Sequence, residues 1–455
     1  MMSLSEMAET VGGELIGNDA RTGGVSSDTR GLEPGELFAA LKGPNFDGHA
    51  FLNAARDAGA AGALVRSGTA AVPGLPLIRV ADTLEALGQI AASWRSRFDV
   101  PVVAVTGSNG KTTVKEMIGA ILAVKAPVLI SKGNLNNEIG VPLTLCRLRP
   151  EHRYAVVEMG MNHPGEIGYL SRLARPTVAV ITNAASAHLE GLGTVQAVAD
   201  AKGEIMWGLA PGGVAVLNGD DAYFEHWRGM AAGHPVLSFG FETTADVHPS
   251  DAVVPASENR FQLSIRDQSL QVVLPLAGRH NTANALAAAA AAFAVGADLE
   301  QIKAGLERVE PVPGRLCVRK GVGGAEILDD SYNANPASVA AGIEVLAARP
   351  GRRILVLGDM AELGIETRSL HRQAGEHARS RGIDELHGIG DMSEAAVAAF
   401  GPTGFHHRDR GELVARLKAE ANGETTFLIK GSRRMRMEEI VDALSDSPRA
   451  NGGGH

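Results

Sequence analysis

The residues best suited to chemistry lie in a glycine-rich segment, Thr-Gly-Ser-Asn-Gly-Lys-Thr-Thr, at positions 106–113. An apolar run, Val100–Val105, precedes it and predicts a strand buried on both faces, and an amphipathic helix is expected after it. Backbone N–H groups and the positive end of that helix would converge on one point, where they can bind phosphate. Lys111 could then bridge terminal phosphates, and the Thr112 hydroxyl could ligate Mg²⁺. The segment therefore predicts a nucleoside triphosphate site.

This segment departs from the common phosphate-loop pattern G-x-x-x-x-G-K-[ST], because Val105 stands where the first glycine is expected and a glycine is found at 107. A glycine-rich turn that only joins a strand to a helix is the structural alternative. The strand before, the helix after and the Lys-Thr pair favour the nucleotide site. The residues expected to form it are Thr106, Gly107, Ser108, Asn109, Gly110, Lys111, Thr112 and Thr113.

Three further polar side chains, Glu158, His188 and Lys202, follow later apolar runs. In a parallel sheet the ends of successive strands line one crevice, so these groups could meet the phosphates. The Glu158 carboxylate suits a second Mg²⁺ ligand, and His188 could bind another ion. Lys202 could ligate a metal only as a carbamate formed with CO₂. The structural alternatives are a solvated strand-end carboxylate, an ordinary loop histidine and a solvated helix lysine.

Two more polar clusters lie downstream of the phosphate segment. Asn281 opens an alanine-rich helix predicted to begin near Thr282, where it could also serve as the N-cap. Arg315 could bind a phosphate through both arms of its guanidinium, and Asp330 could accept hydrogen bonds from ribose hydroxyls. Asn335 precedes a proline and could instead cap a helix through a local turn.

The elements that must position these groups alternate between apolar runs and helical patterns, which predicts a doubly covered parallel sheet. A second α/β unit is expected after Pro311 and Pro313, and the first 98 residues contain short strands and turns with little regular helical period. The predicted strands are Val128–Ile130, Ala155–Val157, Val178–Ile181, Val214–Leu217, Phe261–Ile265, Leu270–Leu274, Ile327–Leu328, Ile354–Leu357, Leu386–Ile389 and Phe427–Ile429. The predicted domains are 1–98, 99–312 and 313–455.

The composition limits the classes of protein that the chain can belong to. The chain has 455 residues, of which 45% are hydrophobic, and its net charge is −9. These values exclude a wholly disordered chain and argue against a general nucleic-acid or membrane-surface binder. Two cysteines suit a reducing compartment, no signal peptide is recognised, and the apolar stretch at 285–297 is too short to span a bilayer. We therefore expect a cytoplasmic protein.

The motifs, taken together, resemble the Mur ligases, which are ATP-dependent amino-acid ligases of peptidoglycan precursor synthesis. The resemblance covers nearly the whole chain, and its motifs in order are TGSNGKTT, EMG, AHLEG, AKGEI, GRHNTANALAA, PGR and DDSYNANP. It implies a small N-terminal α/β domain for the UDP end of the substrate, a central phosphate-loop ATPase domain with a parallel sheet, and a C-terminal Rossmann-like domain for the incoming dipeptide.

Within the family, the chain is most similar to the members that join D-alanyl-D-alanine to UDP-N-acetylmuramoyl-tripeptide. The segments that carry this finer resemblance are KGNLNNEIGVPLTL (132–145), SYNANPAS (331–338), LGDMAELG (357–364) and IKGSRRMRME (429–438). The Asp-Asn-Pro-Arg motif of the sister enzyme that adds a diamino acid is absent. The resemblance implies ATP, two Mg²⁺ ions and a carbamylated lysine as cofactors, and we expect a monomer. It leaves open whether the third peptide residue is lysine or diaminopimelate.

The resemblance also implies a role for each matching residue. It makes Lys111, His188 and Lys202 catalytic, with Thr112, Glu158, His188 and the carbamate of Lys202 around Mg²⁺. It places Asn281 at the adenine, Arg315 at the γ-phosphate and Asp330 at the ribose. The implied substrate contacts are Asn134, Asn136 and Asn137, then Ser27, Asp28, Thr29 and Arg30 for the uridine nucleotide, and Lys430 and Ser432 for the incoming amino acid.

The implied reaction activates a carboxylate as an acyl phosphate, which an amine then attacks. No residue type or spacing identifies the base that takes the proton of the amine, and His188 is only one candidate. The alternatives are another amino-acid ligase of the same superfamily, such as folylpolyglutamate synthetase, and a non-catalytic ATP-binding module. The N-terminal segment Ser-Ser-Asp-Thr-Arg-Gly favours the muramyl substrate. A regulatory GTPase would need an Asn/Thr-Lys-x-Asp run, which the sequence lacks.

Overall fold

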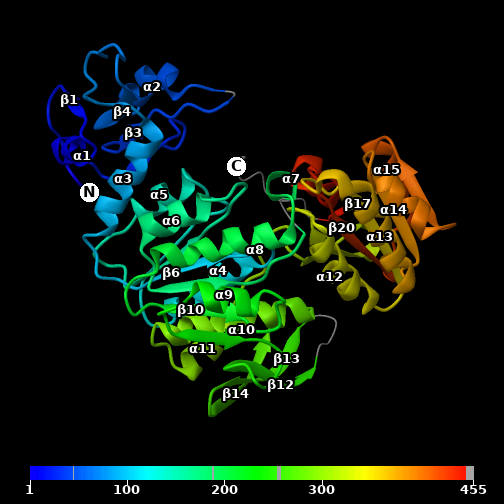
Figure 1. Ribbon diagram of the computed structural model, residues 1–455. Coiled ribbons are helices and arrows are strands. Elements are labelled where there is room, and N and C mark those ends of the chain that lie inside the picture. The colour runs from blue at the N-terminus through cyan, green and yellow to red at the C-terminus, as the bar shows by residue number, and fades with distance from the viewer. Residues whose placement is uncertain (45, 187–188, 254–257, 447–455) are drawn as a thin grey trace.

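The computed structural model describes residues 1–44, 46–186, 189–253 and 258–446. It contains three sheets, of five, nine and six strands, which follow one another along the chain. We call the parts that carry them the N-terminal, central and C-terminal units (Figure 1). Each sheet falls within one of the three predicted segments, which supports 1–98, 99–312 and 313–455 as our proposed domain limits. The three-domain α/β fold class predicted from the sequence is confirmed.

The N-terminal unit is a five-stranded sheet in the order β1-β5-β4-β3-β2, in which only β1 and β5 pair antiparallel. Its strands are β1 (Glu14–Ile16), β2 (Val25–Ser26), β3 (Leu37–Ala39), β4 (Gly62–Arg66) and β5 (Leu77–Val80). Its helices are α1 (Leu4–Thr10), η1 (Gly48–Phe51), α2 (Leu52–Asp57) and α3 (Thr83–Arg95).

Helix α3 contradicts the expectation of little regular helix before residue 98. It has 13 residues, and the Asp82 side chain caps it by accepting hydrogen bonds from the N–H groups of Leu84 and Glu85. Its inner face buries Leu87 and Ile90, flanked by the buried alanines Ala86 and Ala91. The prediction failed because small alanines on the buried face make the helical period faint in the sequence.

The central unit is a nine-stranded sheet in the order β14-β13-β12-β11-β10-β9-β6-β8-β7. Its strands are β6 (Val102–Thr106), β7 (Val128–Ile130), β8 (Tyr154–Glu158), β9 (Val178–Ile181), β10 (Val214–Asn218), β11 (Val236–Phe239), β12 (Val247–Val253), β13 (Asn259–Ile265) and β14 (Gln268–Leu274). Strands β6 to β12 pair in parallel, as predicted for this sheet. Strands β12, β13 and β14 form an antiparallel edge.

Helices cover both faces of the central sheet, because alternate side chains of its strands point to opposite sides. Val102 and Ala104 of β6 pack in a core with α3, α6 and α8, and Val103 and Val105 pack in another with α4, α10 and α11. The first of these cores also contains residues of the N-terminal unit. The helices are α4 (Lys111–Ala123), α5 (Gly140–Leu145), α6 (Glu166–Ala174), α7 (Leu189–Leu192), α8 (Val195–Gly203), η2 (Glu204–Gly208), α9 (Phe224–Met230), α10 (Arg279–Ala294) and α11 (Leu299–Leu306).

The alanine-rich helix α10 begins earlier than predicted, at Arg279 rather than near Thr282. Gly278 therefore stands at the cap position, and Asn281 lies inside the first turn, so Asn281 is not the N-cap. Alanines 285 and 287–292 are all fully buried. Among the described residues, no helix is both long and apolar enough to cross a membrane.

The C-terminal unit is a six-stranded sheet in the order β15-β16-β20-β17-β18-β19, parallel except for the β15–β16 pair. Its strands are β15 (Cys317–Lys320), β16 (Glu326–Asp330), β17 (Arg352–Gly358), β18 (Glu385–Ile389), β19 (Gly404–His407) and β20 (Thr425–Lys430). Its helices are η3 (Val322–Gly324), α12 (Pro336–Ala347), η4 (Gly364–Glu366), α13 (Thr367–Ser380), α14 (Ser393–Phe400), α15 (Arg410–Glu420), η5 (Arg433–Met435) and α16 (Glu438–Leu444). Asn335 caps α12, as its sequence context suggested.

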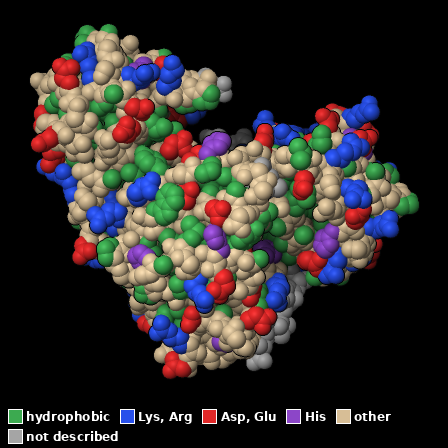
Figure 2. Space-filling view, viewed as in Figure 1, with side chains coloured by type: hydrophobic (Ala, Val, Ile, Leu, Met, Phe, Trp, Pro, Cys, Tyr) green, Lys and Arg blue, Asp and Glu red, His purple; other side chains and the backbone are tan. Residues whose placement is uncertain are grey.

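The surface carries both signs of charge. Figure 2 shows lysine and arginine side chains interspersed with aspartate and glutamate over the face that it displays, with a notch between the N-terminal and C-terminal units. No basic stripe of the kind that tracks a nucleic-acid backbone is seen on that face.

Candidate active site

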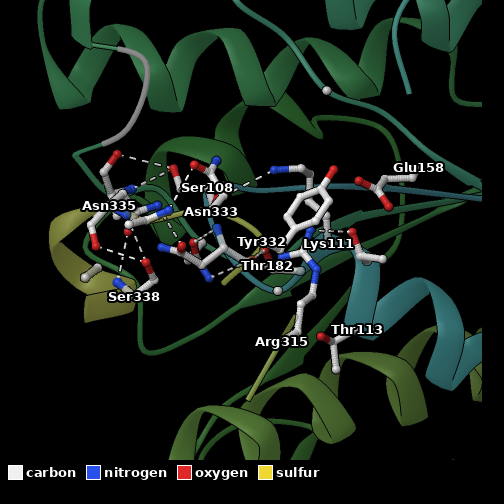
Figure 3. A pocket seen from close by; sticks show the side chains of 18 of the residues that line it. Ser108, Lys111, Thr113, Glu158, Thr182, Arg315, Tyr332, Asn333, Asn335 and Ser338 are labelled. Carbon is white, nitrogen blue, oxygen red and sulfur yellow. Dashed lines mark hydrogen bonds between the residues drawn. The ribbon is translucent and has the colours of Figure 1, made fainter. Parts of the chain in front are cut away.

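A cavity of about 1040 Å³ lies between the central and C-terminal units, and it is where the predicted residues converge. The phosphate segment, the ends of β8 and β9, the start of α10 and the polar loop before α12 all contribute to its wall (Figure 3). The predicted site residues that line it are Ser108, Asn109, Gly110, Lys111, Thr112, Thr113, Asn134, Asn136, Asn137, Glu158, Asn281, Arg315, Asp330, Lys430 and Ser432.

The phosphate segment turns tightly between β6 and α4. Gly107 and Gly110 have φ angles of 152° and 83°, which side chains rarely adopt. A Cβ atom at 107 would lie 1.8 Å from the Thr182 hydroxyl oxygen, and one at 110 would lie 2.3 Å from the Asn284 amide oxygen. No side chain caps α4, so its first N–H groups are left for a ligand. This is the geometry of an anion site.

Lys111 lies at the start of α4 and folds back over the segment. Its ammonium donates a hydrogen bond of 2.7 Å to the carbonyl oxygen of Gly107. Burial lowers the pKa of Lys111, the Glu158 carboxylate opposes that shift, and nearby Arg315 adds to it. A carbonyl oxygen compensates a buried ammonium only in part, so this cation is available to an anionic ligand.

The C-terminal unit contacts the phosphate segment directly through two side chains. Arg315 donates a hydrogen bond of 3.1 Å to the Thr112 hydroxyl oxygen, and its guanidinium lies 4.4 Å from the centre of the Tyr332 ring. The Asn335 amide donates a hydrogen bond of 2.8 Å to the Asn109 side-chain oxygen. Figure 3 shows Arg315 and Lys111 beside the Tyr332 ring. The site is therefore built from two units.

Glu158 ends β8 and is only 2% exposed. Its Oε1 atom accepts a hydrogen bond of 2.9 Å from the Asn136 amide. Its Oε2 atom is buried and has no hydrogen-bond partner among the described residues. The Lys115 ammonium lies 3.8 Å from Oε2, beyond hydrogen-bond distance. A buried carboxylate oxygen without a hydrogen bond is costly, and Mg²⁺ prefers such oxygen donors. Glu158 thus fits a metal ligand.

Lys202 lies at the end of α8 and is 1% exposed, so the solvated-lysine alternative is wrong. Burial, reinforced by the charge of Lys111, holds its pKa well below the usual range. No described residue forms a hydrogen bond with its amine. A neutral amine is the form that reacts with CO₂, so the environment suits a carbamate.

Nearby Glu204 has a structural role, since its carboxylate accepts hydrogen bonds from the N–H groups of Gly165 and Gly168 at the start of α6.

His188 lies outside the described residues, so its predicted role as metal ligand or base stays a prediction.

A polar group from the C-terminal unit lines the other side of the cavity. The Lys430 ammonium donates hydrogen bonds of 2.5 Å to the Asp330 carboxylate and 2.9 Å to the Asn333 carbonyl oxygen. Burial raises the pKa of Asp330, and the positive charges of Lys430 and Arg315 oppose that rise. The hydroxyl oxygen of Ser432 is buried without a hydrogen-bond partner among the described residues. This free hydroxyl suits a polar ligand group.

Two predicted contacts have structural partners of their own. Asn281 donates a hydrogen bond of 2.8 Å to the Ala277 carbonyl oxygen and accepts one of 3.1 Å from Asn284. The Asn137 side-chain oxygen accepts a hydrogen bond of 2.9 Å from the Gly140 N–H at the start of α5. Both side chains still line the cavity.

The predicted uridine contacts, Ser27, Asp28, Thr29 and Arg30, do not line this cavity. They follow β2 in the N-terminal unit, where Arg30 forms an ion pair of 2.6 Å with Asp28 and is 85% exposed at its side chain. The structure therefore brings the expected ATP and dipeptide residues together with Thr112 and Glu158 of the expected metal set, and leaves the expected uridine contacts on a separate unit.

Sequence reasoning missed four residues of the cavity region. Thr182 and Asn284 occupy the space that side chains at 107 and 110 would need, Tyr332 stacks on Arg315, and Lys115 lies one turn after Lys111. Lys115 could have been found from its spacing, because residues four apart share one face of a helix. Thr182 directly follows the predicted strand Val178–Ile181 and carried a similar signal.

Comparisons with known proteins agree with this architecture. Three Mur ligase models match the chain: the family's catalytic domain over 21–95, the middle domain over 105–292 and the glutamate ligase domain over 314–433. The chain belongs to the Mur ligase family. It is 46% identical to the UDP-N-acetylmuramoyl-tripeptide–D-alanyl-D-alanine ligase of Escherichia coli (strain K12), over 98% of this chain and 99% of that protein.

Two solved structures extend the comparison. A crystal structure of MurF from Acinetobacter baumannii is 35% identical, with a TM-score of 0.89, and covers 96% of this chain and 97% of that one. MurF from Thermotoga maritima in complex with ADP is 28% identical, with a TM-score of 0.82, and covers 93% and 96% of the two chains. The family resemblance inferred from the motifs is confirmed.

Proposed function

We propose that this chain joins D-alanyl-D-alanine to UDP-N-acetylmuramoyl-tripeptide, with ATP as the energy source, in the synthesis of peptidoglycan precursors. The chain is an ATP-dependent ligase, and its relatives with this activity match it over nearly their full lengths. The observation that carries the proposal is the cavity in which an uncapped helix start, Lys111 and Arg315 face the acidic and hydroxyl groups of the C-terminal unit. The match over 21–95 argues against an enzyme without an N-terminal substrate domain.

The first step makes the carboxylate reactive. The terminal carboxylate of the tripeptide attacks the γ-phosphorus of ATP, a new P–O bond forms, the bond to the bridging oxygen breaks, and ADP leaves. Two anions must approach each other, so the main task of the site is to compensate negative charge. Lys111, Arg315 and the free N–H groups of α4 supply that compensation. Asn281 would contact the adenine and Asp330 the ribose.

Mg²⁺ belongs to the same proposal, at two positions. Thr112 and Glu158 would hold one ion, and His188 and the carbamate of Lys202 would hold or support the second. When bound, the ions would add positive charge beside the phosphates. The support on this chain is the buried Oε2 atom of Glu158, which accepts no hydrogen bond from a described residue and lies 3.8 Å from the Lys115 ammonium.

The carbamate of Lys202 is proposed from its surroundings. CO₂ adds to the neutral amine, a C–N bond forms, and one proton leaves, so that a buried amine becomes an anion. That anion would face Lys111, whose positive charge makes the ammonium form of Lys202 unfavourable. The carbamate therefore relieves a repulsion that the unmodified ammonium would create.

The second step consumes the acyl phosphate. The neutral amine of D-alanyl-D-alanine attacks the acyl carbon, the C–N bond forms, phosphate leaves, and the amine loses a proton. Lys430 and Ser432 are the proposed contacts of the dipeptide. Asn134, Asn136 and Asn137 are the proposed contacts of the UDP-tripeptide near the reaction, and Ser27, Asp28, Thr29 and Arg30 those of its uridine end.

One experiment tests the function and the open question of the third residue together. ATP and D-alanyl-D-alanine are incubated with the UDP-tripeptide that contains lysine or with the one that contains diaminopimelate, and phosphate release is measured. We expect ADP and phosphate only when both substrates are present, with one tripeptide strongly preferred. Phosphate release that needs neither substrate would support an ATP-binding module instead. Monomeric state and cytoplasmic location complete the proposal.

A further inference from the structure

Lys115 is a fully buried lysine that the reaction described above does not use. It lies on α4 four residues after Lys111, and its side chain is 0% exposed. Burying an ammonium group costs several kcal/mol unless hydrogen bonds and charges compensate it. A leucine or methionine would pack this helix position without that cost. The charge therefore calls for a role other than helix packing.

The ammonium of Lys115 is compensated by the segment that follows β7. It donates hydrogen bonds of 2.9 Å to the Ser131 carbonyl oxygen and 3.4 Å to the Gly133 carbonyl oxygen. It also forms an ion pair of 2.9 Å with Glu116 and lies 3.8 Å from the Oε2 atom of Glu158. Lys115 thus joins a helix, a loop and the proposed metal carboxylate.

Residues 131–137, which we call the asparagine loop, are attached to the sheet at both ends. At its start, the Ser131 hydroxyl accepts a hydrogen bond of 3.2 Å from the Glu158 N–H. Near its end, Asn136 donates to the Glu158 Oε1 atom and accepts a hydrogen bond of 2.8 Å from the Gly160 N–H through its carbonyl oxygen. In the middle, backbone hydrogen bonds from the Leu135 N–H to the Lys132 carbonyl oxygen (3.1 Å) and from the Asn136 N–H to the Asn134 carbonyl oxygen (2.8 Å) shape a turn, and Lys115 ties this turn to α4 through the Gly133 carbonyl oxygen. Asn134, Asn136 and Asn137 form one wall of the cavity.

We propose that Lys115 is a positioning residue that fixes the asparagine loop relative to Glu158. The cavity wall that faces the UDP-tripeptide is then formed before the substrate binds. The inference rests on the proposed function, because it takes the UDP-tripeptide as the ligand of that wall. Lys115 acts through the loop and does not contact the reacting atoms.

The test measures binding by calorimetry, without Mg²⁺, for the wild type and for Lys115→Met. Methionine keeps the length and apolar stem of lysine but loses its hydrogen bonds. We expect the Kd for UDP-tripeptide to rise by about 10- to 100-fold, the size of lost charge-assisted hydrogen bonds, while the Kd for ADP changes less than about twofold. Lys115→Arg should recover part of the loss.

Glu116→Gln is the matched control on the same helix. It removes the partner of Lys115 that is 38% exposed and leaves both carbonyl contacts, so the Kd for UDP-tripeptide should stay within about twofold of the wild type.

A double-mutant cycle separates positioning from a general loss of packing. Lys115→Met and Asn136→Ala act through one loop, so their effects on UDP-tripeptide binding should be clearly less than additive. Lys115→Met and Ser27→Ala lie on different units and should be additive. Equal losses of ADP and UDP-tripeptide affinity, or additivity with Asn136→Ala, would overturn the inference. If Lys115→Met does not fold, the same double-mutant cycle is measured with Lys115→Arg, and its additivity with Asn136→Ala tests the inference. A wild type that binds ADP but no UDP-tripeptide would count against the proposed function itself.

Discussion

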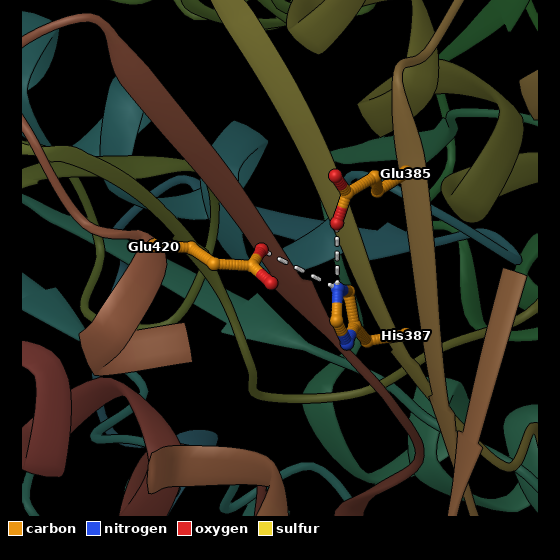
Figure 4. Close-up of side chains that lie close together, drawn as sticks. All are labelled: Glu385, His387 and Glu420. Carbon is orange, nitrogen blue, oxygen red and sulfur yellow. Dashed lines mark hydrogen bonds and ion pairs between the residues drawn. The ribbon is translucent and has the colours of Figure 1, made fainter. Parts of the chain in front are cut away.

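Two clusters of buried ionisable side chains lie in this molecule, and they differ in how their charges are compensated. One lies at the cavity, where the charges of Glu158, Arg315 and Lys202 surround the Lys111 ammonium. The other lies in the C-terminal unit, where ligand atoms of Glu385, His387 and Glu420 lie within 4.8 Å of one another (Figure 4). Judged by residue type alone, the C-terminal cluster resembles a metal site more closely than the cavity does.

Ion pairs to two arginines indicate that the C-terminal cluster is structural. Arg352 forms ion pairs with both Glu385 and Glu420, the latter at 3.1 Å, and Arg416 pairs with the other oxygen of Glu420. Two carboxylates thus face two guanidiniums, and burial lowers the pKa of His387 to about 4, so it is neutral at pH 7. In the cavity, in contrast, the Lys111 ammonium donates its hydrogen bonds to backbone carbonyl oxygens, and the Oε2 atom of Glu158 accepts no hydrogen bond from a described residue. Charged groups that pair with one another indicate a structural role, and charged groups left without hydrogen bonds from opposite charges indicate a place for a ligand.

The largest expected effect is that of Lys111→Ala. It removes the cation nearest the phosphates, so the rate of acyl-phosphate formation should fall by about 10³-fold, while UDP-tripeptide still binds. ATP consumption in single turnovers and calorimetric binding of the UDP-tripeptide measure the two parts. Normal ATP consumption by this variant would remove the phosphate segment from the proposed mechanism.

Lys202→Ala should be nearly as harmful, with a rate loss of about 10²-fold or more, because it removes the anion proposed to support the metal. Short carboxylic acids such as acetate should restore part of the rate by entering the space that the lysine side chain leaves. Lys125→Ala, which removes an exposed ion pair with Asp298, serves as the matched lysine control and should keep the wild-type rate. A Lys202→Ala variant with most of its activity would contradict the carbamate.

The pH dependence of stability tests the balance of the C-terminal cluster. The pKa of His387 is about 4 in the folded protein, against 6.5 for an unperturbed histidine. The unfolded chain therefore binds more protons between these values, and stability falls as pH falls through that window. His387 should contribute a loss of about 2 kcal/mol between pH 7 and pH 5. Urea unfolding of the wild type and His387→Gln at both pH values measures the difference, and an equal loss of stability in the two proteins would contradict the assignment.

Glu420→Gln should have the smallest effect, about 1–2 kcal/mol of stability, since it leaves the partly exposed Arg352 and Arg416 short of one partner. The kcat should not change. Added Zn²⁺ should not raise the melting temperature of the wild type, because the guanidiniums already use the carboxylate oxygens. A rise of several degrees that EDTA reverses would mean that this cluster binds metal after all.

Much of the site could be predicted because many of its residues lie in short contiguous segments of the sequence. The phosphate segment and its flanking strand and helix are contiguous in sequence, and strand ends placed Glu158 near it. The lack of a hydrogen bond at the Glu158 Oε2 atom and the role of Lys115 could not be predicted. Both depend on the asparagine loop, which follows strand β7 and returns to the end of β8. Helix α3 and the true start of α10 were misjudged for a different reason, since alanine-rich faces carry a weak period.

The three units differ in whether they share an apolar core with a neighbouring unit. One apolar cluster runs from the N-terminal sheet through α3 into the central sheet, so separating those two units would expose a shared interior. The clusters inside the C-terminal unit belong almost wholly to that unit. Its links to the central unit include polar contacts such as Asn335–Asn109, Arg315–Thr112 and the Glu190 N–H to the Glu362 carbonyl oxygen, which water can replace. We therefore expect that a hinge motion of the C-terminal unit costs less free energy than a separation of the N-terminal unit from the central one.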